Sequence, residues 1–189
     1  YRIWNSDVVK SLEKTSGGRT FGVGIFPNWW DPSAAERSMQ QIVDLGLKTF
    51  MVPVTPGPGP DGKQAAWGDP HFDRFWAVAA ESKLPICFHV AESLDQAHRG
   101  GLGISTLCIF GPLRKPWGQL VFGGVFDRNP SLQVVFVEAG INWVSGTLQD
   151  AEMIYDTFQG ALDPIKHRPS HYWHNNCYGV LQNDRLGLE

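Results

Sequence analysis

The sequence has few charges and no long apolar run, and both absences limit what the protein can be. Only 19% of its 189 residues are charged, with 16 basic and 19 acidic side chains and a formal net charge of −3. Without an excess of positive charge, the chain has no general attraction for nucleic acid, which we exclude as a partner. No apolar stretch reaches the roughly 18 to 20 residues that a membrane-spanning helix needs, so we expect no membrane association.

Several catalytic and redox motifs are also missing. The chain has no Gly-x-Ser-x-Gly elbow, no His-Glu-x-x-His and no P-loop, so it lacks the starting residues of serine hydrolases and nucleotidases. Its three cysteines, Cys87, Cys108 and Cys177, are odd in number and form no Cys-x-x-Cys pair. We therefore expect a protein of the reducing cytoplasm rather than a disulfide-linked secreted domain.

Short apolar runs alternate with helical patterns along the chain. The runs, which we expect to form buried strands, span residues 19–27, 47–54, 84–90, 132–137 and 177–181. Helices are expected over residues 32–46, 69–83, 117–126 and 141–162. Apolar strands joined by such crossovers are typical of a parallel α/β sheet. Five strands fit an open doubly wound sheet or part of an eight-stranded barrel, which needs roughly 250 residues.

Two polar side chains stand at the carboxyl ends of consecutive expected strands. His89 ends the run Leu-Pro-Ile-Cys-Phe-His, and Glu138 follows Val-Val-Phe-Val. Parallel α/β folds place ligands and catalytic groups at this edge of the sheet. A neutral imidazole is a good metal ligand, and a carboxylate can be a ligand or a general acid/base. The structural alternatives are a buried histidine bonded to a carbonyl group and a salt bridge.

Aromatic and histidine-rich segments supply further candidates. Trp30 and Trp143 lie near expected strand ends, where they could line an aromatic substrate pocket. His167, His171 and His174 cluster in the sequence, and the last two could share one helical face. We expect these three histidines on the surface or behind a site rather than as metal ligands.

Four sequence blocks together point to a known family. They are Leu84-Pro-Ile-Cys-Phe-His89, Phe122-Gly-Gly-Val-Phe-Asp-Arg-Asn-Pro130, Val135-Phe-Val-Glu-Ala-Gly-Ile-Asn-Trp143 and Arg168-Pro-Ser-His-Tyr172. In order and spacing they resemble the amidohydrolase-related family of metal-dependent hydrolases and decarboxylases, one branch of which is like aminocarboxymuconate-semialdehyde decarboxylase. The resemblance implies a TIM-type (β/α)8 barrel, incomplete here, in which residues 1–189 form a single partial domain with about strands three to seven.

The same resemblance implies a metal site of which this sequence holds one part. In the family a His-x-His pair on the first strand, a histidine on the fifth and an aspartate on the eighth hold the metal. Only the fifth-strand ligand has a counterpart here, His89, which indicates a partial sequence. The decarboxylase branch has a histidine at the end of the sixth strand, where this chain has Glu138, and this departure leaves hydrolysis and decarboxylation both open.

These features predict a divalent-metal-dependent hydrolase or non-oxidative decarboxylase that acts on a small, aromatic carboxylate. The metal would be zinc, with manganese as the alternative; His89 would be a ligand and Glu138 the acid/base or a second ligand. Trp143 and Trp30 would bind the substrate, a small molecule, and a homo-oligomer is compatible with this prediction. The competing hypotheses are a catalytically incomplete barrel fragment and a metal-free small-molecule binding module.

Overall fold

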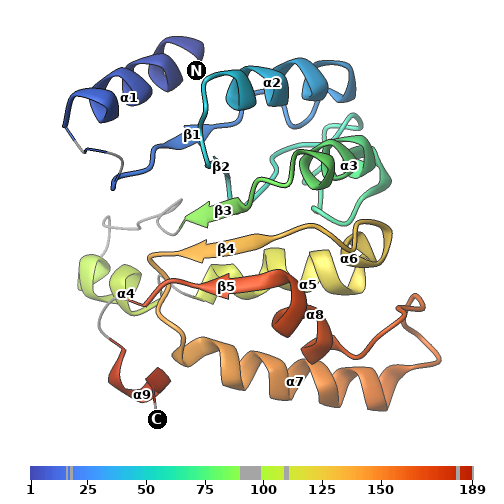
Figure 1. Ribbon diagram of the computed structural model, residues 1–189. Helices are drawn as coiled ribbons and strands as arrows, with labels where there is room; N and C mark the ends of the chain where they lie inside the picture. Colours follow the sequence, from blue (N-terminus) through green and yellow to red (C-terminus); the bar gives the residue numbers. More distant parts are fainter. Residues whose placement is uncertain (16, 18, 90–98, 109–110, 182–183, 189) are drawn as a thin grey trace.

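A five-stranded parallel sheet forms the centre of the computed structural model (Figure 1), which describes residues 1–15, 17, 19–89, 99–108, 111–181 and 184–188. The strands are β1 (Val23–Ile25), β2 (Thr49–Val52), β3 (Ile86–His89), β4 (Val134–Val137) and β5 (Cys177–Gly179). Their order in the sheet follows the chain, and every neighbouring pair is parallel. The predicted parallel α/β sheet and its five strands are confirmed.

Helices connect the strands. They are α1 (Arg2–Thr15), α2 (Pro32–Asp44), the 3-10 turn η1 (Pro70–Phe72), α3 (Asp73–Ser82), α4 (Gly101–Cys108), the 3-10 turn η2 (Gly111–Leu113), α5 (Arg114–Phe122), α6 (Val125–Arg128), α7 (Asn142–Phe158), α8 (Pro169–Asn176) and α9 (Arg185–Leu188). In Figure 1, α1 and α2 lie beside β1 at one end of the sheet, and α7 and α8 lie beyond β5 at the other. None of the described helices has the length and hydropathy needed to cross a bilayer.

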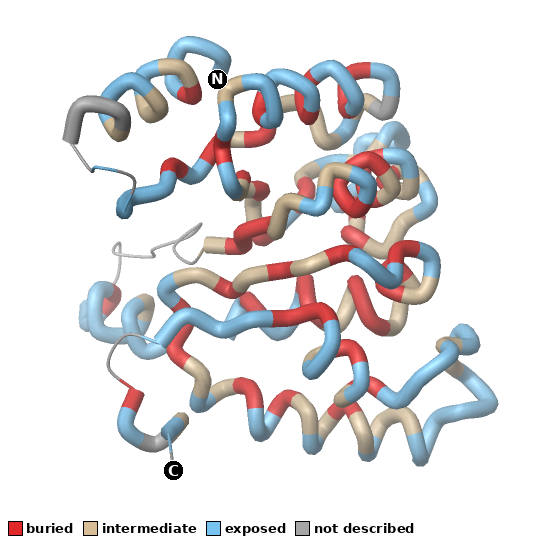
Figure 2. Tube along the Cα trace, viewed as in Figure 1, coloured by how far each residue is buried: buried red, intermediate tan, exposed pale blue. Residues whose placement is uncertain are grey.

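The two faces of the sheet differ sharply in burial. One row of register partners is almost completely buried, and it consists of Gly24, Phe50, Ile86, Val134 and Cys177. On this face the ring of Phe136 contacts Trp143 of α7 and Trp173 of α8. Buried residues accordingly follow the strands and the helix faces turned toward them (Figure 2). The helices therefore cover this face of the sheet.

The opposite face carries a second row of register partners, which runs through Ile25, Met51, Cys87, Val135 and Tyr178. Cys87 at its centre is buried, but Ile25, Met51 and Val135 are only half-buried, and Tyr178 is 57% exposed. A face that is apolar yet partly open corresponds to the inner wall of a (β/α)8 barrel, which side chains from all eight strands fill.

The expected helix over residues 117–126 is wrong in its continuity. Two helices, α5 and α6, occupy this region, separated by Gly123 and Gly124. Gly124 adopts a left-handed φ of 65°, which breaks the helix. Gly123 lies so close to Gly68 that a Cβ atom there would be 2.7 Å from the Gly68 Cα. Close packing against the segment before α3 thus interrupts a sequence that otherwise favours one helix.

Helix α1 was not expected, and it protects an edge of the sheet. Its buried Asn5 accepts a hydrogen bond from the Ile25 N–H at 2.9 Å and donates one to the Ile25 carbonyl at 3.2 Å. The side-chain amide satisfies the backbone groups that the edge strand β1 turns away from β2. Such cover lowers the tendency of an edge strand to pair with another chain.

Candidate metal centre

His89 and Glu138 lie side by side at the carboxyl ends of β3 and β4. The His89 Nε2 is 2.9 Å from the Glu138 Oε2. The strand register explains this approach, because His89 pairs with Val137 and Glu138 is the next residue. Their side chains are 40% and 47% exposed, so the pair is accessible to a ligand. The structure therefore brings together the two polar groups that the sequence places at consecutive strand ends.

Glu138 reaches this position through an unusual backbone conformation. The backbone φ angle of Glu138 is 57°, in the left-handed region that residues other than glycine rarely adopt. The cost of this conformation is roughly 1–2 kcal/mol for an L-residue. Left-handed residues other than glycine persist only where the surrounding structure determines them, and they are frequent at functional sites.

The pair suits a divalent ion in the kind and spacing of its donors. Two ligands bound at right angles, each about 2.1 Å from an ion, lie about 3.0 Å apart, which is close to the observed 2.9 Å between Nε2 and Oε2. The described residues contain no group of three or more histidine, cysteine, aspartate or glutamate side chains that could hold a metal. Within the described residues, the pair thus offers at most two of the three protein ligands that a catalytic metal typically takes.

Cys87 shares the sheet face of His89 but is unsuited to ligation. It is buried, and its Sγ lies 3.1 Å from the Thr49 Oγ1. Burial raises the pKa of the Cys87 thiol, and a thiol must be deprotonated to bind a metal. This agrees with Cys87 as a core residue.

The two candidate tryptophans occupy different surroundings. Trp143 lies on the first turn of α7, five residues after Glu138, and its Nε1 donates to the Gly140 carbonyl at 3.2 Å. Trp30 is 45% exposed, packs edge-on against Trp29 and accepts a hydrogen bond at its carbonyl oxygen from His71 Nε2 at 2.8 Å. The described contacts connect Trp143, but not Trp30, to the turn that carries Glu138. Their role in substrate binding stays a prediction.

The three clustered histidines lie away from this pair, on and before α8. His167, His171 and His174 are all exposed, and the rings of the first two stack with centroids 4.0 Å apart. Their described contacts are with α8 and Tyr172, in agreement with the surface position expected for them.

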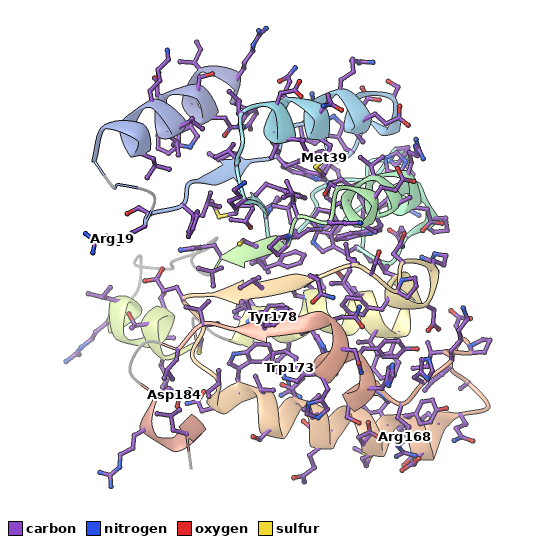
Figure 3. All side chains as sticks on the ribbon, viewed as in Figure 1. Arg19, Met39, Arg168, Trp173, Tyr178 and Asp184 are labelled. Carbon is purple, nitrogen blue, oxygen red and sulfur yellow. The ribbon has the colours of Figure 1, made fainter. Side chains whose placement is uncertain are left out.

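Asp184 is a residue of the site region that the sequence did not reveal. Its carboxylate accepts hydrogen bonds from the N–H groups of Ile141 at 2.5 Å, Asn142 at 2.6 Å and Gly187 at 2.9 Å. These bonds, that from Ile141 above all, lower the pKa of Asp184. Figure 3 shows Asp184 beside the start of α7. Nothing local in Asn-Asp-Arg indicates a partner more than forty residues away.

The fold matches several solved structures. An amidohydrolase from Mycobacterium avium subsp. paratuberculosis is 24% identical with a TM-score of 0.73 over 87% of this chain and 44% of its own. The 5-carboxyvanillate decarboxylase LigW from Sphingomonas paucimobilis is 21% identical, with a TM-score of 0.74 over 94% and 52%. A dihydroxybenzoic acid decarboxylase from Polaromonas sp. JS666, with bound manganese and 2-nitroresorcinol, is 19% identical, with a TM-score of 0.72 over 96% and 56%.

These matches define how much of the barrel is present. The chain spans about half the length of the solved structures that it matches, and its five parallel strands form a partial barrel of the TIM type. Curated protein sequences give no significant match. The sequence profile described as Amidohydrolase matches residues 4–182. The chain therefore belongs to the amidohydrolase family.

Proposed function

We propose that this chain contributes His89 and Glu138 to the active site of a divalent-metal-dependent, non-oxidative decarboxylase that acts on a small aromatic carboxylate. The observation that carries the proposal is the 2.9 Å approach of the His89 Nε2 to the Glu138 Oε2 at the ends of adjacent parallel strands. This edge of a parallel sheet is where barrel enzymes place their catalytic groups. The chain spans about half of its structural relatives, so the proposal concerns the active site of the whole catalytic unit.

Several of the structural relatives are decarboxylases and favour decarboxylation over hydrolysis, whereas two are described as amidohydrolases. They include decarboxylases of 5-carboxyvanillate and 2,6-dihydroxybenzoate, one of them complexed with 2,6-dihydroxybenzoate. Manganese is bound in the Polaromonas enzyme and in the 5-carboxyvanillate decarboxylase from Novosphingobium aromaticivorans. We therefore favour manganese over zinc as the metal.

The proposed roles follow from the chemistry of the two side chains. A bound divalent ion supplies positive charge that polarises the oxygen atoms of the substrate. His89 would hold that ion through Nε2, the atom that now contacts Glu138. Glu138, when protonated at Oε2, would deliver its proton to the ring carbon as the bond to the carboxylate breaks. The bonding electron pair stays on that carbon and takes the proton, carbon dioxide leaves, and Glu138 regains a proton from water.

Trp143 and Trp30 stay the proposed substrate contacts, and Trp143 is the nearer of the two to Glu138 along the chain. It is half-buried and directly follows the turn that carries Glu138. Its ring packs against Phe136 and Trp173 on the helix-covered face of the sheet, so only the part of the indole left exposed is available to an aromatic ring. Trp30 has described contacts only with Trp29 and His71, so we assign it the lesser role.

Metal content tests the proposal directly. The purified chain is equilibrated with manganese, dialysed and analysed for metal, and its release of carbon dioxide from 2,6-dihydroxybenzoate is followed. We expect bound manganese in the wild type, loss of that manganese in His89→Ala, and loss of carbon dioxide release in Glu138→Gln. His174→Ala and Glu81→Gln are matched controls, because both residues are exposed and lie outside the pair.

Four results contradict the proposal, and they separate the competing hypotheses. Manganese retained in full by His89→Ala would show that the metal binds elsewhere. A folded, metal-free chain that still binds 2,6-dihydroxybenzoate would identify a metal-free binding module, whereas one that binds neither would identify a catalytically incomplete fragment. Hydrolysis of an amide or ester without decarboxylation would place the chain with the hydrolases.

A further inference from the structure

The turn between β4 and α7 changes direction within five residues. Glu138 and Gly140 both have a left-handed backbone, with φ of 57° and 62°, and α7 begins at Asn142. We call residues 138–142 the β4–α7 turn. Glu138 is nearly half exposed, so packing does little to direct its side chain. The direction in which its carboxylate points is therefore set mainly by the backbone of the turn.

Asp184, from a segment more than forty residues later in the chain, binds the backbone of this turn. One of its oxygen atoms, Oδ2, accepts both the Ile141 and the Asn142 N–H groups, and Oδ1 accepts the Gly187 N–H. Asp184 itself is buried, with 9% of its surface exposed. Hydrogen bonds to a charged acceptor are shorter and stronger than neutral ones, and the start of α7 further favours a negative charge.

The contact between the turn and the Asp184 segment leaves no free space. A Cβ atom on Gly140 would lie 2.9 Å from the Asp184 Oδ2, and one on Gly187 would lie 2.6 Å from the same oxygen. A Cβ atom on Gly187 would also overlap the Ile141 side chain. Glycine at both positions therefore lets the carboxylate reach the backbone of the turn.

We propose that Asp184 is a positioning residue that fixes the β4–α7 turn so that the Glu138 carboxylate faces His89. Asp184 contacts neither side chain of the pair in the described structure; it acts through the backbone between Ile141 and Glu138. A left-handed glutamate needs surroundings that enforce its conformation, and the two hydrogen bonds from Ile141 and Asn142 to Asp184 supply part of that enforcement. The role in catalysis rests on the proposed function, whereas the effect on the pair does not.

The histidine ring signals in ¹⁵N NMR spectra test this inference without metal or substrate. The spectrum of the folded, metal-free chain is compared with those of Glu138→Gln, Asp184→Asn and the double variant at one fixed pH. We expect the His89 ring signal in Asp184→Asn to move most of the way to its position in Glu138→Gln. In the double variant the signal should coincide with that of Glu138→Gln. Asp61→Asn is the matched control, because that exposed aspartate also accepts a backbone N–H, from Lys63.

Two outcomes overturn the inference. A His89 signal in Asp184→Asn that coincides with the wild type would show that the pair forms without Asp184. A double variant that moves further than Glu138→Gln would show that Asp184 affects the histidine by another route. If Asp184→Asn does not fold, Gly187→Ala takes its place, since it pushes the carboxylate from the turn at unchanged charge. Gly146→Ala is its control, because a Cβ atom there meets nothing within 4 Å.

Carbon dioxide release then separates this inference from the proposed function. Asp184 orients the proposed proton donor, and a misplaced catalytic group can cost about 100-fold in rate, so we expect at least tenfold slower release of carbon dioxide from 2,6-dihydroxybenzoate in Asp184→Asn. If Glu138→Gln leaves this release unchanged while the ring signals follow the expected pattern, the proposed function fails and the positioning role stands. If Glu138→Gln slows the release while Asp184→Asn does not, the positioning role fails alone.

Discussion

Replacing Glu138 with glycine should stabilise the fold relative to replacing it with glutamine. A left-handed backbone costs an L-residue roughly 1–2 kcal/mol, and glycine, which avoids this cost, loses roughly 0.5–1 kcal/mol through its greater freedom in the unfolded chain. With φ at 57°, the net difference is about 1 kcal/mol in favour of glycine. For a chain of this size, the thermal midpoint should rise by about 2–4 °C.

Thermal unfolding followed by circular dichroism measures this difference. Both changes are made in the His89→Ala background, so that a residual hydrogen bond from glutamine to the imidazole does not enter the comparison. Lys83, with φ of 58° at the end of α3, is the positive control, because Lys83→Gly should stabilise by a similar amount. Glu81 within α3 is the opposite control, because glycine should be about 1 kcal/mol worse than glutamine there.

Equal midpoints for the two Glu138 variants, or a lower one for glycine, would refute this reasoning. Such a result would mean that Glu138 does not adopt the left-handed conformation in solution, and the positioning role of Asp184 would lose its structural basis. If the midpoints differ as expected, the wild type keeps a strained residue where glycine would be more stable. That is the pattern of a side chain retained for function at a cost in stability.

Other perturbations have equally definite expected outcomes. Because the folded pKa of Asp184 is lowered, its ionised form stabilises the fold above the unfolded pKa of about 3.9 and this contribution is lost as the pH falls below it; Asp184→Asn should therefore flatten the dependence of the thermal midpoint on pH in that acidic range. Asn5→Ala removes two hydrogen bonds to the edge strand β1 and leaves the Ile25 N–H without its partner. The free energy of unfolding from urea titrations should therefore fall by about 2 kcal/mol. In native alkylation followed by mass spectrometry, the exposed Cys108 should react first, because Cys87 and Cys177 are buried and burial raises the pKa of both thiols.

The sequence predicted the strands better than the connections between them. Each strand is a short apolar run, and such a run can be recognised from neighbouring residues alone. The break between α5 and α6 is not local, because Gly123 is needed where that helix meets Gly68 from a distant segment. Helix α1 was missed for a related reason: its buried Asn5 is polar in the sequence and is explained only by its contacts with Ile25.

The sequence likewise revealed one part of the candidate site and not the other. The positions of His89 and Glu138 at consecutive strand ends were visible in the sequence, since parallel pairing brings such ends to one edge. The register that sets their separation was not visible, because it depends on Val137 lying opposite His89. Asp184 could not be found at all from the sequence, because its partners are backbone N–H groups, which every residue except proline carries.

The pair should form more readily than the complete metal site. Its geometry depends on the pairing of β3 with β4 and on the turn held by Asp184, all within the described residues. A metal ion in a catalytic site typically takes three protein ligands, and of the pair only His89 has that proposed role. Further donors would have to face the partly open inner wall of the sheet, where Val23 and Tyr178 are 40% and 57% exposed. The His89 ring signal should therefore report an intact pair even at manganese concentrations too low to saturate the site, and a pair that forms only in the presence of manganese would contradict this order of assembly.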